Sequence, residues 1–219
     1  MATAKERLSH LLELAAQGAE QRAALAGEVA DLLLDWPAQY PQAMRATFGA
    51  LLEKIVREVD PSARAGLAAR FEGAKDFPLS LFNEFFLAAS PAMQDATLAR
   101  NEALGAHEPA HLDTDALLSA ARTQRDFAGA LARIAGIAEG TAQAIAADAS
   151  ALAALCKGAG INRATFSAMA ILTGPARSVH ENFAMLTVFD RVPANGAAQL
   201  LAYWRSRGDS APALVEHAA

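Results

Sequence analysis

Short amphipathic helices with frequent interruptions are the pattern that most constrains how this chain can fold. Apolar residues recur every three or four positions, as in Leu25, Val29 and Leu32, which is the spacing of one helix face. Each stripe stops at a helix breaker or a capping residue. Examples of these stops are Trp36-Pro37, Asp60-Pro61, Phe77-Pro78, Ser90-Pro91 and Asn162. The pattern predicts an all-α fold, with a first stripe at Leu8, Leu11 and Leu12.

The composition supports this prediction and a sizeable core. Of the 219 residues, 53% are hydrophobic and only 6% are aromatic, and Ala, Leu, Glu and Arg dominate most segments while β-branched residues are sparse. Such side chains lose little rotamer freedom in helices. A chain of this length forms one domain or two small fused lobes.

Net charge and hydropathy argue against nucleic-acid binding, secretion and membrane insertion. The formal net charge of -5 opposes attraction to a polyanion, so we do not expect nucleic-acid binding. The opening residues lack the apolar core of a signal peptide, and the longest uncharged run, 164–176, is too short to span a bilayer. We therefore expect a cytoplasmic protein without membrane insertion. The single cysteine, Cys156, excludes an intrachain disulfide and is expected in the core.

Several helix starts echo one another along the chain. Arg22-Ala23-Ala24-Leu25-Ala26 is similar to Arg64-Ala65-Gly66-Leu67-Ala68, and the segment from Pro61 to Arg70 aligns with that from Pro91 to Arg100. The spacing is that of helix-pair repeats, which bury their apolar faces by stacking. We expect an irregular α-solenoid of HEAT-like helix pairs over residues 1–110, continued by a compact helical lobe over residues 111–219.

A wider resemblance agrees with this architecture. Asp60-Pro61-Ser62-Ala63-Arg64 is similar to the inner-helix pattern of HEAT-like repeats. Together with the opening 7–34, the stretch 155–166 and the closing 199–205, it resembles a bacterial family of helical-repeat proteins known only as a domain of unknown function. The resemblance implies a helical-repeat fold; the family supplies no established activity and no functional residues.

The segment His107-Glu108-Pro109-Ala110-His111 fits a zinc-binding string but should not bind zinc. The string requires both imidazoles on one face of a continuous helix. Pro109 removes a helical hydrogen bond and pushes Glu108 out of the α region. We expect a solvated connector. We assign no metal, no cofactor and no catalytic residue.

Two tight αα-corners are predicted, at Ala135-Gly136-Ile137 and at Ala159-Gly160-Ile161. Each resembles the turn of a helix-turn-helix, in which glycine makes the turn. The helix after the first corner, 139–148, has no Lys or Arg. The second offers Lys157 and Arg163, which could contact phosphate, although Phe166 and Met169 indicate packing. We interpret both corners as structural.

Phenylalanines concentrate in residues 77–87, and their side chains spread over more than one helix face. One interpretation is a central helix covered by its neighbours on both sides. The other is a groove that receives a partner helix. The second makes Phe82, Phe85 and Phe86 candidate partner-binding residues, to which we add Arg163 of the second corner.

Taken together, the sequence favours a non-catalytic protein-interaction or regulatory adaptor, because stacked helix pairs make extended binding surfaces. We expect a protein partner of unknown identity, and self-association stays open. The alternative is a helix-turn-helix regulator that uses the corner at 155–169. A third hypothesis is an enzyme whose site the sequence does not reveal.

Overall fold

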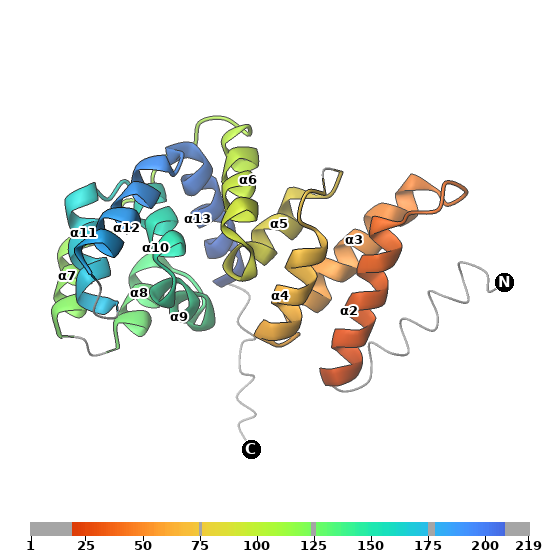
Figure 1. Ribbon diagram of the computed structural model, residues 1–219, viewed down its shortest axis with the longest axis horizontal. Helices are drawn as coiled ribbons and strands as arrows, with labels where there is room; N and C mark the ends of the chain where they lie inside the picture. The colour runs from red at the N-terminus through yellow and green to blue at the C-terminus, as the bar shows by residue number, and fades with distance from the viewer. Residues whose placement is uncertain (1–18, 75, 124–125, 175–177, 209–219) are drawn as a thin grey trace, which may run out of the picture. The chain divides into compact units, whose positions relative to one another are not determined.

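The computed structural model describes residues 19–74, 76–123, 126–174 and 178–208, and every regular element in these ranges is a helix (Figure 1). The all-α prediction is therefore confirmed for the described part of the chain. The stripe at Leu8, Leu11 and Leu12 lies outside it. Contacts divide the chain into two compact units, unit 1 (residues 1–94) and unit 2 (residues 95–219). The division falls inside a helix, before the residue 110 that the sequence suggested.

Unit 1 is a series of short helices joined by turns. They are α2 (Ala19–Leu34), α3 (Gln42–Val56), α4 (Pro61–Arg70), α5 (Leu79–Phe85), the 3-10 helix η1 (Phe86–Ala88) and the first turn of α6 (Pro91–Glu102). The bounds follow the breakers in the sequence. Helix α2 ends just before Trp36-Pro37, and α4 begins at Pro61, because proline suits a first turn and its predecessor resists the α conformation.

The Asp-Pro joint between α3 and α4 satisfies both helix ends. The Asp60 carboxylate accepts hydrogen bonds of 2.9 Å from two free N–H groups in the first turn of α4. Arg64 reaches back and donates to carbonyl oxygens at the end of α3, those of Val56, Arg57 and Val59, at 3.1, 3.2 and 3.4 Å. Free backbone groups on both sides of the turn therefore find partners.

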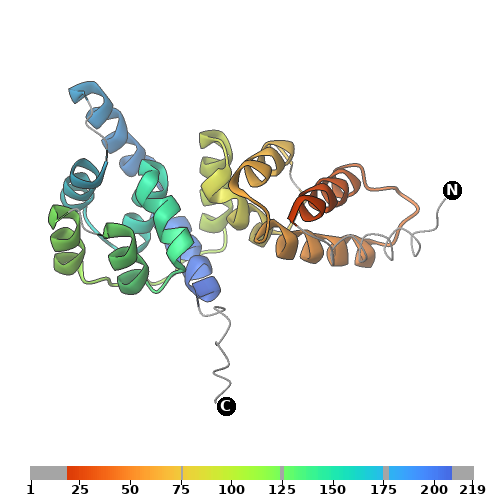
Figure 2. The same cartoon turned by 90° about the horizontal axis from the view of Figure 1, so that it is seen from below.

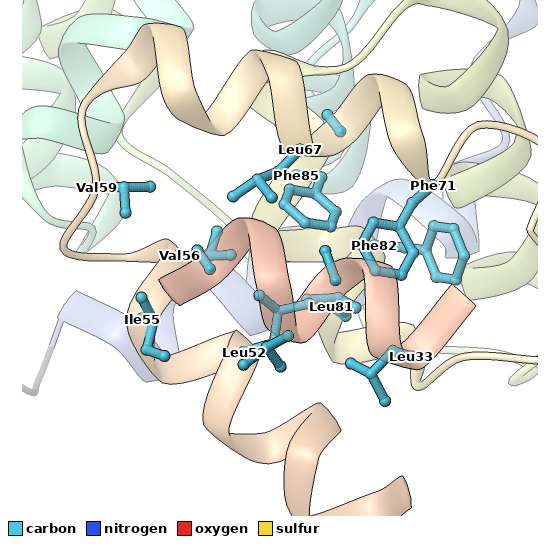
Figure 3. Close-up of a cluster of buried hydrophobic side chains, with 14 of the residues drawn as sticks. Leu33, Leu52, Ile55, Val56, Val59, Leu67, Phe71, Leu81, Phe82 and Phe85 are labelled. Atoms are coloured by element: carbon cyan, nitrogen blue, oxygen red, sulfur yellow. The ribbon is translucent and has the colours of Figure 1, made fainter. Parts of the chain in front are cut away.

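The core of unit 1 lies where α2, α3, α4 and α5 meet (Figure 3). Leu33, Leu52, Phe71 and Phe85 are all buried there. The Phe71 ring packs edge-on against Phe77, with centroids 4.9 Å apart, and lies 5.4 Å from Phe85. Complete burial of a leucine or phenylalanine contributes about 1.5–3 kcal/mol, so this cluster is a major source of stability for the unit.

Unit 2 continues with helices only in its described residues. They are the remainder of α6, α7 (Thr114–Thr123), α8 (Phe127–Ala135), α9 (Glu139–Ala147), α10 (Ala149–Gly158), α11 (Arg163–Thr173), α12 (Val179–Arg191) and α13 (Ala194–Gly208). Helix α12 begins directly after Ser178. No helix in the described ranges combines the length and apolar character needed to cross a membrane.

Helix α13 packs along α10 in unit 2 and lies close to α6 (Figures 1 and 2). The approach is close because glycines lie at both crossings. A Cβ atom at Gly158 would overlap the carbonyl oxygen of Ala197, and one at Gly196 would overlap that of Leu98. Farther along, Arg205 Nε donates to the carbonyl oxygen of Ala135 at 2.7 Å, which ties α13 to the end of α8.

Contacts with α13 explain why the boundary between the two units lies before residue 110. Glu102, at the end of α6, accepts hydrogen bonds from Asn195 Nδ2, at 3.1 Å, and from the backbone N–H of Gly196. The N–H of Ala110 donates to the carbonyl oxygen of Gly158 at 3.2 Å. The connector that contains Ala110, next to the lobe boundary expected from the sequence, is therefore held by unit 2. A helix stop shows where an element ends, but packing decides which unit contains it.

The two predicted αα-corners have the same backbone geometry. Gly136 and Gly160 have φ of +67° and +70°, a region that glycine enters without a steric cost. The next residue in each case donates its N–H five residues back, from Ile137 to Ala132 at 3.0 Å and from Ile161 to Cys156 at 2.8 Å. This is the Schellman arrangement, which satisfies free carbonyls at a helix end. The sequence echo thus corresponds to one turn used twice.

Candidate functional site

The phenylalanines proposed as partner anchors are core residues. Phe82, Phe85 and Phe86 are 4%, 0% and 0% exposed, respectively. Figure 3 shows Phe82 and Phe85 within the cluster of unit 1. Neighbouring helices cover both sides of α5, and the chain tightens into η1 at Phe86, which departs from ideal helical spacing. The groove interpretation is therefore corrected, and the covered central helix agrees with the burial.

Arg163 lies on the surface of unit 2, at the start of α11. Its Nε donates to Asp190 Oδ1 of α12 at 2.9 Å, and both side chains are about half exposed. The other cation of the second corner, Lys157, lies with Nζ 4.6 Å from the ring centroid of Phe189. Asn162 caps α11 by accepting from the N–H of Thr165 at 3.0 Å. The polar groups of this corner thus have partners within the protein.

Helices α11 and α12 form an antiparallel hairpin (Figure 1). Inside it, the rings of Phe166 and Phe189 stack with centroids 4.9 Å apart. The pairs Phe166–Phe189 and Arg163–Asp190 fix the register of the two helices. Continuing that register along the hairpin brings Ile171 of α11 level with Phe183 of α12.

Ile171 and Phe183 are unusually exposed for their size. They are 52% and 64% exposed, whereas Met185 and Phe189 on the inner side of α12 are buried. Phe183 lies seven residues before Asp190, about two turns, and therefore on the same side of α12. We call Arg163, Ile171, Phe183 and Asp190 the hairpin face. It has an ion pair at one end and two large apolar side chains at the other.

A cavity of about 380 Å³ lies in unit 1 beside α3, with mostly apolar walls formed by Leu33, Ala46, Phe77 and Pro78. Gln42, Arg45 and Asp76 also line it, and it is open to solvent, since Ala46 and Pro78 are exposed. The Arg45 guanidinium carbon lies 4.9 Å from the ring centroid of Phe77, and its Nη2 makes a long contact of 3.5 Å with the carbonyl oxygen of Leu33. We call this the Arg45 cavity.

The remaining candidates of the sequence have structural placements. Residues 105–113 are not helical, and His107, Glu108 and His111 are exposed, so the connector prediction is confirmed. Within the described ranges, no group of three His, Cys, Asp or Glu residues could hold a metal ion. Cys156 is fully buried in α10, and this burial raises the pKa of its thiol. The sequence correctly places Cys156 in the core.

Comparison with known proteins adds no relative: no family model, curated protein sequence or solved structure matches the chain. Sequence reasoning missed the hairpin face and the Arg45 cavity. Phe183 carried a detectable signal, because it lies off the stripe of Met185, Phe189 and Val192 that faces the core. The cavity carried none, since it depends on how the segment before α5 folds back onto α3.

Proposed function

We propose that this chain is a non-catalytic protein-interaction adaptor and that its partner contacts the hairpin face. The observation that carries the proposal is the exposure of Phe183 and Ile171 at the same level of one helical hairpin. A partner that buried either side chain completely would gain about 1.5–3 kcal/mol from removing it from water. Aromatic side chains are common anchors of protein interfaces.

The surroundings of these two side chains suit a helical or extended partner segment. Ala184, which follows Phe183 on α12, is exposed and small. Small side chains beside a large anchor let a partner backbone approach closely. The Arg163–Asp190 pair at the other end supplies a charged rim, which contributes more to orientation than to affinity.

We also propose that the helix pairs of unit 1 stack as an irregular HEAT-like solenoid. Helices α2 and α3 pack on each other, as do α4 and α5, and the Asp60 and Arg64 joint links one pair to the next. Stacked pairs would give the adaptor a second extended surface. Small-angle scattering of the purified chain tests this arrangement, since a solenoid and a globular bundle differ in their distance distributions.

The test of the adaptor uses Phe183→Ser. Because Phe183 is mostly exposed, we expect its melting temperature to stay within about 2 °C of the wild type. We expect the variant to lose the proteins that copurify with the wild type from the native cell, identified by mass spectrometry. A photoreactive residue at position 183 should crosslink the same partner.

Two control variants make the result interpretable. Leu104→Ser removes another exposed apolar side chain, 62% exposed and outside the hairpin, and should retain the partner. Phe85→Ala truncates a buried ring and should cost about 3–5 kcal/mol of folding stability. Sedimentation analysis of the purified chain shows whether the partner is a second copy of the chain or a different protein. Unchanged copurification and crosslinking with Phe183→Ser would contradict the proposal.

A further inference from the structure

We propose that the Arg45 cavity binds a carboxylate attached to an apolar group. The site is independent of the hairpin face, since its lining residues all belong to unit 1. Its volume, about 380 Å³, lies within the range of small-molecule pockets, roughly 300–1,000 Å³. Such pockets combine mostly apolar walls with a few polar groups that orient the ligand.

Arg45 is the polar group that defines the ligand. Its Nε is buried and has no hydrogen-bond partner among the described residues. Within the described part of the chain, its guanidinium makes one hydrogen bond, to the carbonyl oxygen of Leu33, and this contact is long at 3.5 Å. A guanidinium carries five N–H donors in a planar fork that matches the two oxygens of a carboxylate. The buried Nε is out of reach of a ligand, so the donors that a carboxylate can meet are the terminal Nη groups, which the protein engages only through this long contact.

The position of the guanidinium is fixed by its contact with Phe77. The 4.9 Å separation between guanidinium carbon and ring centroid is that of a cation–π pair, which holds the fork against one wall of the cavity. Leu33, Ala46 and Pro78 supply the remaining apolar surface. A ligand whose carboxylate meets Arg45 can thus bury an apolar body against these side chains.

Asp76 restricts the charge of that ligand. It is exposed, lines the same cavity and forms no ion pair with Arg45 within 4 Å. A second negative charge on the ligand would meet this carboxylate and be disfavoured. The cavity should therefore prefer a monocarboxylate to a dicarboxylate of similar size.

The carboxylate could belong to a free acid or to the C-terminus of a peptide. Phenylacetate represents the first and acetyl-Gly-Phe with a free carboxylate the second, and each has its uncharged amide as a matched control. Protein-observed NMR titration of the full chain gives the affinity of each probe. We expect at least one acid to bind with Kd in the millimolar range or below, and its amide at least about tenfold more weakly.

Three variants test the residues. Arg45→Gln should weaken binding of the acid at least about tenfold, because it removes the charge and the fork. Ala46→Phe should block the cavity without altering Arg45. Asp76→Asn should tighten binding severalfold and reduce the discrimination against a dicarboxylate. Arg70→Gln is the matched control, since Arg70 is exposed, pairs with Asp31 and does not line the cavity, and it should leave the affinity within about twofold.

The relative affinity of the two acids distinguishes the sources of the carboxylate. A tighter peptide acid assigns the cavity to protein C-termini, and a tighter phenylacetate assigns it to small acids. Equal binding of acids and amides would overturn the proposal, as would unchanged affinity in Arg45→Gln. Absence of binding by both acids at concentrations of about 10 mM would also overturn it, because a preformed pocket of this kind should reach that affinity.

Discussion

Cys156 shows how the environment of one side chain determines its chemistry. The thiol lies in α10, where Leu152, Leu155 and the alanines between them are buried as well. Ionisation would place a charge among apolar groups, which is why burial raises the pKa of this thiol. A thiol of this kind is inert as a nucleophile, because only the thiolate reacts readily.

This burial should make the stability of the protein depend on alkaline pH. In the unfolded chain the thiol ionises near its ordinary pKa of about 8.5, while the folded protein retains the proton. The contribution of Cys156 to stability is therefore complete below about pH 8.5 and falls above it, by about 2 kcal/mol at pH 10. Urea unfolding of the wild type and of Cys156→Ala, each at about pH 8.5 and at pH 10, measures this loss of stability. If both proteins lose equal stability between these pH values, Cys156 does not titrate as described.

For individual side chains, the sequence predicted which ones are buried better than which ones are exposed. The helical segment around Cys156 correctly indicated that this residue belongs to a core, because periodicity reports which side of a helix avoids water. Periodicity could not decide whether the wide apolar helix at 77–87 was covered on both sides. Phe183 was missed because a single apolar residue off a stripe is common on protein surfaces.

Among the elements, local rules predicted the ends of helices well. Asp60 caps, Pro61 begins a helix, and Gly136 and Gly160 make corners, and each of these is a property of a few adjacent residues. The contacts between helices were not predictable in the same way. Nothing local in Gly158 or Gly196 indicates that the backbone of another helix lies against it.

The glycines at the α13 crossings give a testable consequence. Gly158→Ala should destabilise the protein by about 1–3 kcal/mol, because the new methyl group meets backbone atoms that cannot rotate away. Gly140→Ala is the matched control in the same unit, since a Cβ there has no neighbour within 4 Å. It should be neutral or stabilising by up to about 1 kcal/mol. Urea denaturation followed by circular dichroism measures both, and equal stabilities would show that α10 and α13 are farther apart.

For the whole molecule, net charge and local pairing lead to the same expectation about DNA. The chain carries a formal charge of -5, and Arg163 of the second corner is paired with Asp190. We expect no measurable binding to a fluorescent duplex at about 150 mM salt, since such binding depends on unpaired cations that displace counterions. Asp190→Asn, which removes the charged partner of Arg163, should not produce DNA binding either. Salt-dependent binding that Arg163→Ala abolishes would instead favour the helix-turn-helix alternative.

The packing of α13 against α6 and α10 also bears on the order of folding during synthesis on the ribosome. Glu102 and Gly196, which are hydrogen-bonded in the folded protein, are 94 residues apart in the chain. The helices from α6 to α10 must therefore wait, partly uncovered, until residues 194–208 have emerged. The residues of unit 1 emerge much earlier and can fold as soon as they do. We therefore expect the apolar surface of nascent unit 2 to stay uncovered longer than that of unit 1.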